Sequence, residues 1–394
     1  MNPMQIQAIV LPDYGEEIQL QTVTLDPPRD HEVRVRIKAS GICHTDWHVV
    51  TGHLPLPVPM VLGHEGAGVV EALGEGVTRV KVGDRVVIGW VAACGQCFWC
   101  REGQPELCEA ANQGAVDGVM ADQSTRLHDG ALTLHPFSNT GTLAEAVVVL
   151  DTALTAIPAN MPWEEAALLG CAVQTGTGAA FHAPISPGCS VAVIGCGGVG
   201  LNIIQGARIR GAARIFAIDP SGANRDLAQV LGATDTIDPQ ADDPLLSVLD
   251  FTGDRGVDVA FEAVGSPDTM AQAYAMIRRG GTAVVVGVPS PNSEVTLNAF
   301  AFPSQEKTLT GSWYGGASLP RDIPRLVHLW ESGQLRLAPL IRRRYTLAQV
   351  STALMDMVSG QGGRGVVLIH GADDASPSLT DERNESEETN HGGI

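Results

Sequence analysis

The stretch Gly195–Gly200, which reads GCGGVG, constrains the fold of this chain more than any other feature of the sequence. It fits the pattern G-x-G-x-x-G, follows the apolar run VAVI and opens the helical segment VGLNIIQGARIRG. Glycines at such a junction keep the turn tight and let a dinucleotide pyrophosphate approach the backbone, while the helix N-terminus offers free N–H groups to it. The alternative is a glycine-rich packing turn in an ordinary α/β domain.

An acidic residue follows where a dinucleotide site needs one. Asp219 ends the next strand-like run, ARIFAID. Its carboxylate can accept both adenosine ribose hydroxyls and would repel a 2′-phosphate, which favours NAD over NADP. The cation of Arg225 leaves some use of NADP open. The expected cofactor-binding residues of this region are Gly195, Gly197, Gly198, Val199, Gly200, Asp219 and Asn224.

The segments around this junction alternate between strand-like and helix-like patterns. Downstream come the helical segment SGANRDLAQVLGA, the apolar runs VDVAFEAVG and TAVVVGV, and the helical segment PDTMAQAYAMIRR between those two runs. Alternation of this kind predicts an α/β fold with a doubly wound parallel sheet.

The first 150 residues have a different character and predict a second, β-rich domain. HEVRVRIKAS, GAGVVEALG and GDRVVIGWV show the short alternating patterns of half-buried strands. Beyond residue 313, DIPRLVHLWESGQL predicts a helix and RGVVLI a last strand, so we expect the chain to return to the first domain. A chain of 394 residues is long enough for about two domains.

The charge and hydropathy of the chain limit its partners. A formal net charge of −19 argues against a nucleic-acid partner, which would need a basic surface. We see neither a membrane-spanning stretch nor a signal peptide, and we expect a cytoplasmic protein without a membrane partner. Residues 371–394 carry seven carboxylates against one arginine, and we expect them to form a disordered acidic tail.

Half of the cysteines fall in one segment, CGQCFWCREGQPELC, at Cys94, Cys97, Cys100 and Cys108. A disulfide knot would need an oxidising compartment, which nothing else in the sequence supports. An iron–sulfur cluster can also use the spacing C-x2-C-x2-C. Four thiolates in a compact loop suit tetrahedral zinc without an open position, so we interpret the segment as a structural zinc site, with iron–sulfur as the alternative.

A second candidate set is dispersed along the chain: Cys43 in SGICHTDWH, His64 in GHEGAG and Cys171 in LLGCAVQTG. Two thiolates and one imidazole leave a zinc ion with one open position, as in catalytic sites. Asp46 would orient His64 by accepting its other ring N–H. Taken singly, each residue also fits an ordinary buried position, and spacing alone does not join the three.

The order of these motifs resembles that of zinc-dependent alcohol dehydrogenases of the medium-chain dehydrogenase/reductase superfamily. The resemblance rests on GHEGAG with Gly74 and Val77 behind it, on the cysteine segment, on the G-C-x-x-x-T-G pattern around Cys171 and on GCGGVG. It covers about residues 5–370. It implies a GroES-like β-rich catalytic domain over residues 1–172 and 314–370, and a Rossmann NAD-binding domain over residues 173–313.

The resemblance also implies a role for individual residues. Cys43, His64 and Cys171 would hold a catalytic zinc with Glu65 behind it, and the four clustered cysteines would hold a structural zinc, giving two zinc ions per chain. The implied proton relay is Thr45, which touches the substrate oxygen, and His48, which passes the proton to solvent. The remaining implied contacts to the cofactor are His44 and Arg364 at the pyrophosphate, Thr175 on the nicotinamide side, and the Val288 backbone at the carboxamide.

The implied activity interconverts a primary alcohol and its aldehyde by hydride transfer to NAD. Leu54, Trp90 and Phe137, with Trp313 as a further candidate, would form an apolar slot for a medium-chain or aromatic alcohol, although each also fits ordinary core. The stretch CEAANQG lacks the arginine by which related formaldehyde dehydrogenases hold glutathione, which counts against a glutathione adduct. A different thiol cofactor stays open.

The long segment from Asn112 to Thr140 is the form typical of dimeric relatives, so we expect a homodimer paired through strands near residues 295–315, with a tetramer as the alternative. Rival interpretations are a polyol or secondary-alcohol dehydrogenase of the same fold, a zinc-free enone or quinone reductase, and a non-catalytic NAD-binding protein. The intact zinc ligands count against the reductase, and the presence of Thr45 and His48 counts against the non-catalytic protein.

Overall fold

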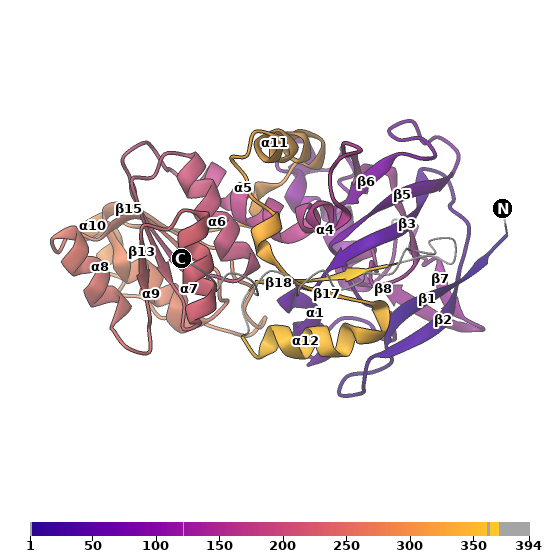
Figure 1. Cartoon of the computed structure of the whole chain (residues 1–394), viewed down its shortest axis with the longest axis horizontal. Coiled ribbons are helices and arrows are strands. Elements are labelled where there is room, and N and C mark those ends of the chain that lie inside the picture. The colour runs from indigo at the N-terminus through magenta and orange to yellow at the C-terminus, as the bar shows by residue number, and fades with distance from the viewer. Residues whose placement is uncertain (1, 121, 361–362, 370–394) are drawn as a thin grey trace, which may run out of the picture.

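The computed structural model describes residues 2–120, 122–360 and 363–369. Figure 1 shows a β-rich part, which contains the first strands, beside a second part built on a parallel sheet. The predicted acidic tail, residues 371–394, lies outside the described residues. Within them, no helix combines the length and the apolar character needed to cross a bilayer.

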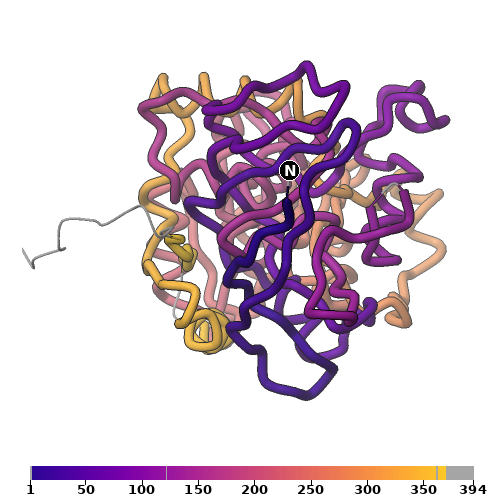
Figure 2. Tube along the Cα trace, turned by 90° about the vertical axis from the view of Figure 1, so that its right-hand side faces the viewer, coloured from indigo at the N-terminus to yellow at the C-terminus, as the bar shows by residue number. Residues whose placement is uncertain are grey.

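The β-rich part contains a closed barrel and a second sheet. The paired strands β1 and β2 cross the face that Figure 2 turns toward the viewer. The barrel runs in the order β1 (Met4–Leu11), β2 (Gln19–Leu25), β7 (Leu127–Asp129), β8 (Leu132–Pro136) and β4 (Met60–Val61). The second sheet runs β10 (Leu154–Ala156), β6 (Arg85–Ile88), β5 (Gly66–Leu73), β3 (Glu32–Gly41), β18 (Arg364–Leu368) and β17 (Ile341–Tyr345), with β9 (Ala146–Leu150) on β3.

The end of the chain completes this second sheet. Strand β18 runs antiparallel to β3, with Val366 opposite Gly41. Residues from both ends of the sequence are therefore neighbours, and β18 carries Arg364 toward the region around β3 and β5.

The other part is the predicted doubly wound parallel sheet, and the predicted fold class is confirmed. Its order is β13 (Asp235–Ile237), β12 (Arg214–Ile218), β11 (Ser190–Ile194), β14 (Val257–Glu262), β15 (Ile277–Val285) and β16 (Thr308–Gly311). All neighbouring strands are parallel. The chain continues from β11 to β12 on one side and later places β14 on the other, so the crevice for a ligand opens at the carboxyl end of β11.

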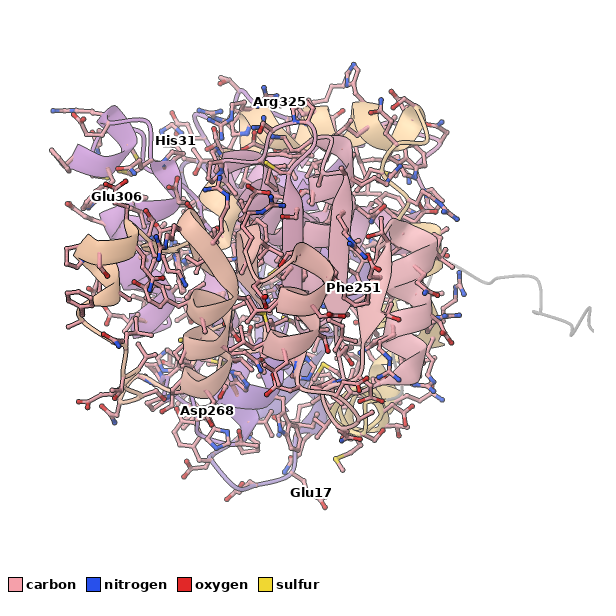
Figure 3. The ribbon with its side chains drawn as sticks, turned by 90° about the vertical axis from the view of Figure 1, so that its left-hand side faces the viewer. Glu17, His31, Phe251, Asp268, Glu306 and Arg325 are labelled. Carbon is pink, nitrogen blue, oxygen red and sulfur yellow. The ribbon has the colours of Figure 1, made fainter. Side chains whose placement is uncertain are left out.

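Helices cover this sheet, and Figure 3 views them from the side of the parallel-sheet part. They are α6 (Gly198–Ile209), α7 (Gly222–Leu231), α8 (Pro244–Thr252), α9 (Pro267–Met276) and α10 (Ala301–Gln305). The sequence pattern continued the helix of α9 to Arg279, but Ile277–Arg279 begin β15, because Ile277 pairs with Val257 and is buried there.

Two long segments connect the parts. The first contains α4 (Trp163–Leu168), the π-helical turn η4 (Leu169–Val173) and α5 (Gln174–His182). Helix α5 packs closely on α6, since a Cβ at Gly176 would lie 2.3 Å from the Val199 carbonyl oxygen. The second follows β16 through the turn η5 (Tyr314–Gly316) to α11 (Leu319–Glu331). The other helices are α1 (His44–Val50), α2 (Phe98–Arg101), α3 (Glu109–Asp117) and α12 (Val350–Val358).

Candidate active site

The first cluster joins side chains from three separate segments of the chain. Cys43 precedes α1, His64 and Glu65 lie between β4 and β5, and Cys171 lies in η4. Their sulfur, nitrogen and oxygen ligand atoms all lie within 4.8 Å of one another. Cys43, His64 and Glu65 are buried, and Cys171 is partly buried. Two sulfurs and an imidazole at this distance suit a zinc ion that keeps one position open.

Asp46 joins the segments that carry two of these side chains. Its buried carboxylate accepts the backbone N–H groups of Cys43 at 3.0 Å and Gly63 at 3.1 Å. The same carboxylate lies 3.5 Å from Nδ1 of His64, within ion-pair distance but without the predicted hydrogen bond. His64 therefore presents its other nitrogen, Nε2, as the candidate ligand atom.

The charges in the cluster favour one deprotonated sulfur. The hydrogen bond from Cys171 and the charge of His64 lower the pKa of Cys43 well below its usual value, although burial opposes this. Burial alone would lower the pKa of His64, but Asp46 and Cys43 outweigh it and raise the pKa. Cations bind thiolates in preference to thiols. A bound zinc ion would therefore displace the proton of the hydrogen bond between Cys171 and Cys43.

Glu65 lies behind the cluster and forms a buried ion pair with Arg364 of β18. Burial raises the pKa of Glu65 to about 7, against the lowering effect of Arg364. Arg364 also lies at the start of α6, since a Cβ at Gly198 would come 2.4 Å from its Nη1. Arg364 thus stands between the cluster and the glycine-rich turn, where the sequence placed a cation for the pyrophosphate.

The glycine-rich turn has the geometry that a dinucleotide needs. Gly195 has a positive φ of 88°, and a Cβ at Gly200 would lie only 1.8 Å from the Gly195 carbonyl oxygen. A Cβ at Gly197, in contrast, would meet nothing within 4 Å. Gly198 and Val199 then form the first turn of α6. The chain therefore needs Gly200 for its own packing, whereas the space beside Gly197 is free for a ligand.

Asp219 sits at the end of β12 beside this turn. It is buried, and its carboxylate accepts the backbone N–H groups of Cys196 at 2.7 Å and Ser221 at 2.8 Å. Arg225 forms an ion pair with Asp238 at 2.9 Å and donates to the Asp219 carbonyl oxygen. Because Arg225 is engaged in this way, the carboxylate of Asp219 dominates the ribose end of the site, which fits NAD better than NADP.

Two further predicted cofactor contacts lie around the same sheet edge, Asn224 in the first turn of α7 and Val288 on the loop after β15. The Asn224 amide donates to the Asp219 carboxylate at 3.2 Å and accepts the N–H of Gly363 at 3.3 Å. The backbone of Val288 packs against Gly265, since a Cβ at Gly265 would lie 2.6 Å from the Val288 carbonyl oxygen. Both residues therefore stand at the carboxyl ends of the parallel strands.

The predicted relay residues Thr45 and His48 lie on α1, and Thr175, the predicted contact on the nicotinamide side, lies on α5. The Thr45 hydroxyl is 3.5 Å from the sulfur of Cys43, and the Thr175 hydroxyl is 4.0 Å from the sulfur of Cys171. His48 is half-buried, one turn further along α1, while His44 at the start of the helix is exposed. Burial lowers the pKa of His48, and the neighbouring His44 lowers it further.

An aromatic wall stands next to the cluster. The rings of Trp90 and Trp313 meet edge to face, with centroids 5.5 Å apart and an interplanar angle of 89°. Trp90 also packs on Tyr314 with centroids 4.7 Å apart. The buried hydroxyl of Tyr314 donates to the carbonyl oxygen of Gly170, directly before Cys171. We refer to Trp90, Trp313 and Tyr314 as the aromatic wall.

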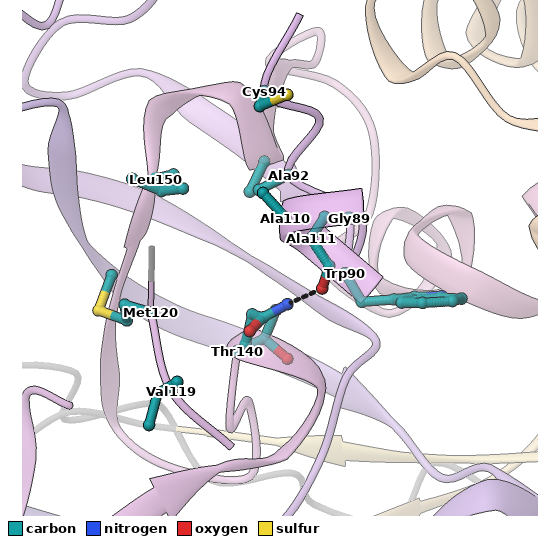
Figure 4. Close-up of a pocket in the computed structure, with 12 residues that line it drawn as sticks. Gly89, Trp90, Ala92, Cys94, Ala110, Ala111, Val119, Met120, Thr140 and Leu150 are labelled. Carbon is teal, nitrogen blue, oxygen red and sulfur yellow. Dashed lines mark hydrogen bonds between the residues drawn. The ribbon is translucent and has the colours of Figure 1, made fainter. Parts of the chain in front are cut away.

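The other predicted pocket residues lie elsewhere around the cluster. Phe137 is buried and packs edge to face on the His64 ring at 5.1 Å, and Leu54 packs against the same hydrophobic core. A separate apolar cavity of about 60 Å³ lies behind Trp90, toward α3. In Figure 4 the Trp90 ring points away from this cavity. Two of the lining residues are joined by a hydrogen bond from Asn139 to the Ala111 carbonyl oxygen.

The second cluster contains Cys94, Cys97, Cys100 and Cys108, whose sulfurs lie within 4.8 Å of one another. None of these four cysteines forms a disulfide. The Cys94 sulfur accepts the backbone N–H of Cys97 at 3.4 Å, and the Cys108 sulfur accepts that of Cys94 at 3.3 Å. Backbone N–H groups that point at sulfur stabilise thiolates, so the geometry suits a closed four-sulfur metal site.

Comparison with known proteins is consistent with this geometry. Residues 29–159 match the family described as alcohol dehydrogenase GroES-like domain, and residues 198–332 match the family described as zinc-binding dehydrogenase. The chain is 36% identical over 376 residues to an NDMA-dependent alcohol dehydrogenase of Amycolatopsis methanolica, covering 94% of this chain and 100% of the relative. The chain belongs to the zinc-dependent alcohol dehydrogenases of the medium-chain dehydrogenase/reductase superfamily.

Other members of this family are similar over the same length. An S-(hydroxymethyl)glutathione dehydrogenase of Synechocystis is 37% identical over 92% of this chain and 100% of the relative. The crystal structure of benzyl alcohol dehydrogenase from Acinetobacter calcoaceticus has a TM-score of 0.88 and 31% identity, and covers 93% of this chain and 100% of that chain. The family and the GroES-like and NAD-binding fold predicted from the sequence are thereby confirmed.

Sequence reasoning did not find every residue of this zinc-dependent dehydrogenase site. Tyr314 received no role, although it stands next to Trp313, which was a candidate. Asn112 was only the start of a long segment, yet its side chain contacts the aromatic wall. The adjacent aromatic pair directly after the last strand of the parallel sheet was the available signal for Tyr314, whereas nothing in the sequence indicated Asn112.

Proposed function

We propose that this protein interconverts a primary alcohol, medium-chain or aromatic, and its aldehyde by hydride transfer to NAD. The observation that carries the proposal is the meeting of Cys43, His64 and Cys171 within 4.8 Å, next to the Arg364 side chain that reaches the glycine-rich turn. A metal-ligand set and a dinucleotide turn so close together suit an alcohol dehydrogenase better than a binding protein.

Cys43, His64 and Cys171 would hold the catalytic zinc ion. Bound there, zinc supplies Lewis acidity, which lowers the pKa of an alcohol hydroxyl. Thr45 would accept the hydroxyl proton as it releases its own, and His48 would pass the released proton to solvent. Asp46 keeps His64 in the tautomer that leaves Nε2 free, and the Glu65–Arg364 pair fixes the cluster against the cofactor side.

The glycine-rich turn would bind the pyrophosphate and Asp219 the adenosine ribose of NAD, which supplies the hydride acceptor. Arg364 would place positive charge beside the phosphates with the His44 ring as a second contact, and Thr175 would contact the nicotinamide side. Cys94, Cys97, Cys100 and Cys108 would hold a second zinc ion with a purely structural role.

The proposal is tested by metal analysis and NAD reduction together. We expect two zinc ions per chain, one for each cluster, and NADH formation with benzyl alcohol and 1-hexanol. Cys43→Ser should lose one zinc ion and at least about 100-fold in kcat, because the Lewis acid is lost. Cys189→Ser, outside both clusters, is the matched control and should keep zinc and activity. Full activity in Cys43→Ser would overturn the proposal.

A second candidate substrate comes from the relatives, two of which are S-(hydroxymethyl)glutathione dehydrogenases at 37% and 34% identity. The same assay with S-(hydroxymethyl)glutathione decides between this substrate and a free primary alcohol. The missing arginine after Cys108 favours the free alcohol. An arm with NDMA in place of added NAD tests whether alcohol oxidation by this protein uses NDMA, since one relative is named as an NDMA-dependent alcohol dehydrogenase. We also propose a cytoplasmic homodimer.

A further inference from the structure

The aromatic wall is tied to the cysteine-rich segment by a single side chain. The indole Nε1 of Trp313 donates to Oδ1 of Asn112 at 2.9 Å, across 201 positions of the sequence. Asn112 lies on α3, which begins directly after Cys108. Trp313 keeps 43% of its surface exposed, so this bond, together with the Trp90 contact, fixes a ring that packing alone does not enclose.

The orientation of the Asn112 amide is itself determined. Its Nδ2 donates to the carbonyl oxygens of Glu106 at 3.0 Å and Cys108 at 2.8 Å. Turning the amide over would place its NH2 group against the indole N–H and its oxygen against two carbonyl oxygens, and all three contacts would become repulsive. The backbone at Cys108, a ligand of the proposed structural zinc, therefore sets where the acceptor for Trp313 lies.

The backbone on the other side of Trp313 is also held in a special conformation. Tyr314, Gly315 and Gly316 follow with positive φ angles of 50°, 69° and 68°. This turn presses on α5, since a Cβ at Gly315 would lie 2.6 Å from the Thr175 carbonyl oxygen. Glycine adopts a positive φ without strain, whereas Tyr314 does so only where the surroundings impose it, and such residues concentrate where geometry serves function.

We propose that Asn112 is a positioning residue that holds the Trp313 indole across Trp90 and thereby makes the cysteine-rich segment set the width of the alcohol channel. The inference rests on the proposed function and refines its substrate class. With Trp313 held edge to face against Trp90, a flat or unbranched primary alcohol passes the aromatic wall. An alcohol branched at the carbon that bears the hydroxyl collides with the Trp313 ring. Loss of the hydrogen bond frees the ring and removes this discrimination.

The test compares benzyl alcohol with 1-phenylethanol, which differ by one methyl group at the reacting carbon. In the wild-type enzyme we expect kcat/KM to favour benzyl alcohol by about 10- to 200-fold, the range that a methyl-sized difference gives. Asn112→Leu should reduce this ratio at least about 5-fold, mainly through a higher kcat/KM for 1-phenylethanol, while kcat for ethanol stays within about 2-fold because the reacting groups are unchanged. Gln113→Leu, the neighbouring residue on α3, is the control and should keep the ratio.

A double-mutant cycle separates positioning from a purely structural role. Trp313→Phe keeps a ring but no donor, so it should lower the ratio as Asn112→Leu does, and the double variant should show no further loss. Additive effects, or an unchanged ratio with a lower Tm or a lost zinc ion in Asn112→Leu, would overturn the inference while the wild-type activity still supports the proposed function. A wild-type protein that oxidises neither alcohol would overturn both.

Discussion

Among single residues, Asp46 organises more of the site than any side chain that would touch the metal. Its carboxylate holds the backbone at Cys43 and at Gly63 and lies beside His64. Two of the three proposed zinc ligands therefore depend on one buried acid. Residues that hold the ligands of a metal in place affect its binding affinity strongly, although they do not contact the ion themselves.

Replacing this acid tests that dependence. Asp46→Asn keeps the size of the side chain but turns one acceptor into a donor, which would face a backbone N–H. We expect zinc affinity at the Cys43 cluster to fall by about 10- to 100-fold, while the four-cysteine cluster keeps its ion. Dialysis against graded chelator with zinc counted per chain measures this. Asp26→Asn, which alters an Asp–His pair far from the site, should leave the zinc content unchanged; equal loss in both variants would contradict the prediction.

His48 gives the site a defined pH dependence. Burial and the nearby His44 lower its pKa below the ordinary 6.5, so the neutral form that accepts a proton persists on the acid side of that value. We expect kcat/KM for alcohol oxidation to remain high at pH 6.5 and to fall only at lower pH. His48→Gln should lose about 10-fold or more in kcat and show no such acid limb.

A pH–rate profile from pH 5 to 8 measures the effect. His53→Gln is the control, since His53 lies beside His48 with ring centroids 6.2 Å apart but bonds to the Thr51 hydroxyl. Because His53 also lowers the His48 pKa, this variant should shift the acid limb upward without removing it. An acid limb centred above pH 6.5, or one that survives in His48→Gln, would show that another group carries the proton.

At the scale of elements, the junction of β11 and α6 contains one glycine that the packing of the chain requires and one that the proposed cofactor requires. Gly200 allows α6 to start against Gly195, where a side chain would collide with backbone. Gly197 has an ordinary φ of −74° and free space around it, so its lack of a side chain serves no contact within the described protein. The absence of a side chain therefore has a different physical reason at each of these two glycines.

Alanine at each position distinguishes these reasons. Gly200→Ala forces a Cβ to within 1.8 Å of a carbonyl oxygen and should lower stability by at least about 1–3 kcal/mol, as overpacking does. Gly197→Ala should keep the wild-type Tm but weaken NAD binding at least about 10-fold, because the new methyl group occupies space that the pyrophosphate needs. Thermal unfolding without NAD and titration with NAD measure the two effects. A destabilised Gly197→Ala would contradict the assignment.

These elements also show which parts of the fold can be predicted from the sequence. The strands and helices around GCGGVG were predictable because the hydrophobic period and the glycine spacing are local properties. The end of α9 was not, since Ile277 fits a helix face as well as a strand that pairs with Val257. Cys43, His64 and Cys171 could be joined only by resemblance, because three distant segments supply them.

At the scale of the whole molecule, contacts between segments distant in the sequence were the hardest to predict. The Glu65–Arg364 pair depends on β18 returning to β3, and the Asn112–Trp313 bond depends on α3 meeting the turn after β16. Such contacts follow from the packing of complete elements, which no local pattern encodes. Through them, Arg364 lies between the Cys43 cluster and Gly198 of α6, and the cysteine-rich segment is joined to the turn after β16.

The outer edge of the parallel sheet bears on assembly. Strand β16 is an edge strand whose residues are mostly exposed, and its backbone groups on the open side lack partners within the sheet. Phe300, with 77% of its surface exposed, and Phe302, with 40%, lie on α10 or directly before it, close to the same edge in sequence. An open strand edge beside exposed aromatic rings favours two-fold pairing of two copies, in line with the homodimer expected from the sequence.

We therefore expect Phe300→Asp to weaken the dimer by at least about 10-fold in Kd, since each copy would place a charge in the apolar contact. Sedimentation velocity over a dilution series measures the Kd. Leu246→Asp on α8 is the control, because Leu246 is also exposed, at 64%. In Figure 3, Phe251 of the same helix lies away from Glu306, which stands shortly before β16 in the sequence. Dissociation by Leu246→Asp instead, or a monomeric wild-type protein, would show that the β16 edge does not form the interface. A tetramer that Phe300→Asp splits into dimers would retain the β16 pairing as one of two interfaces.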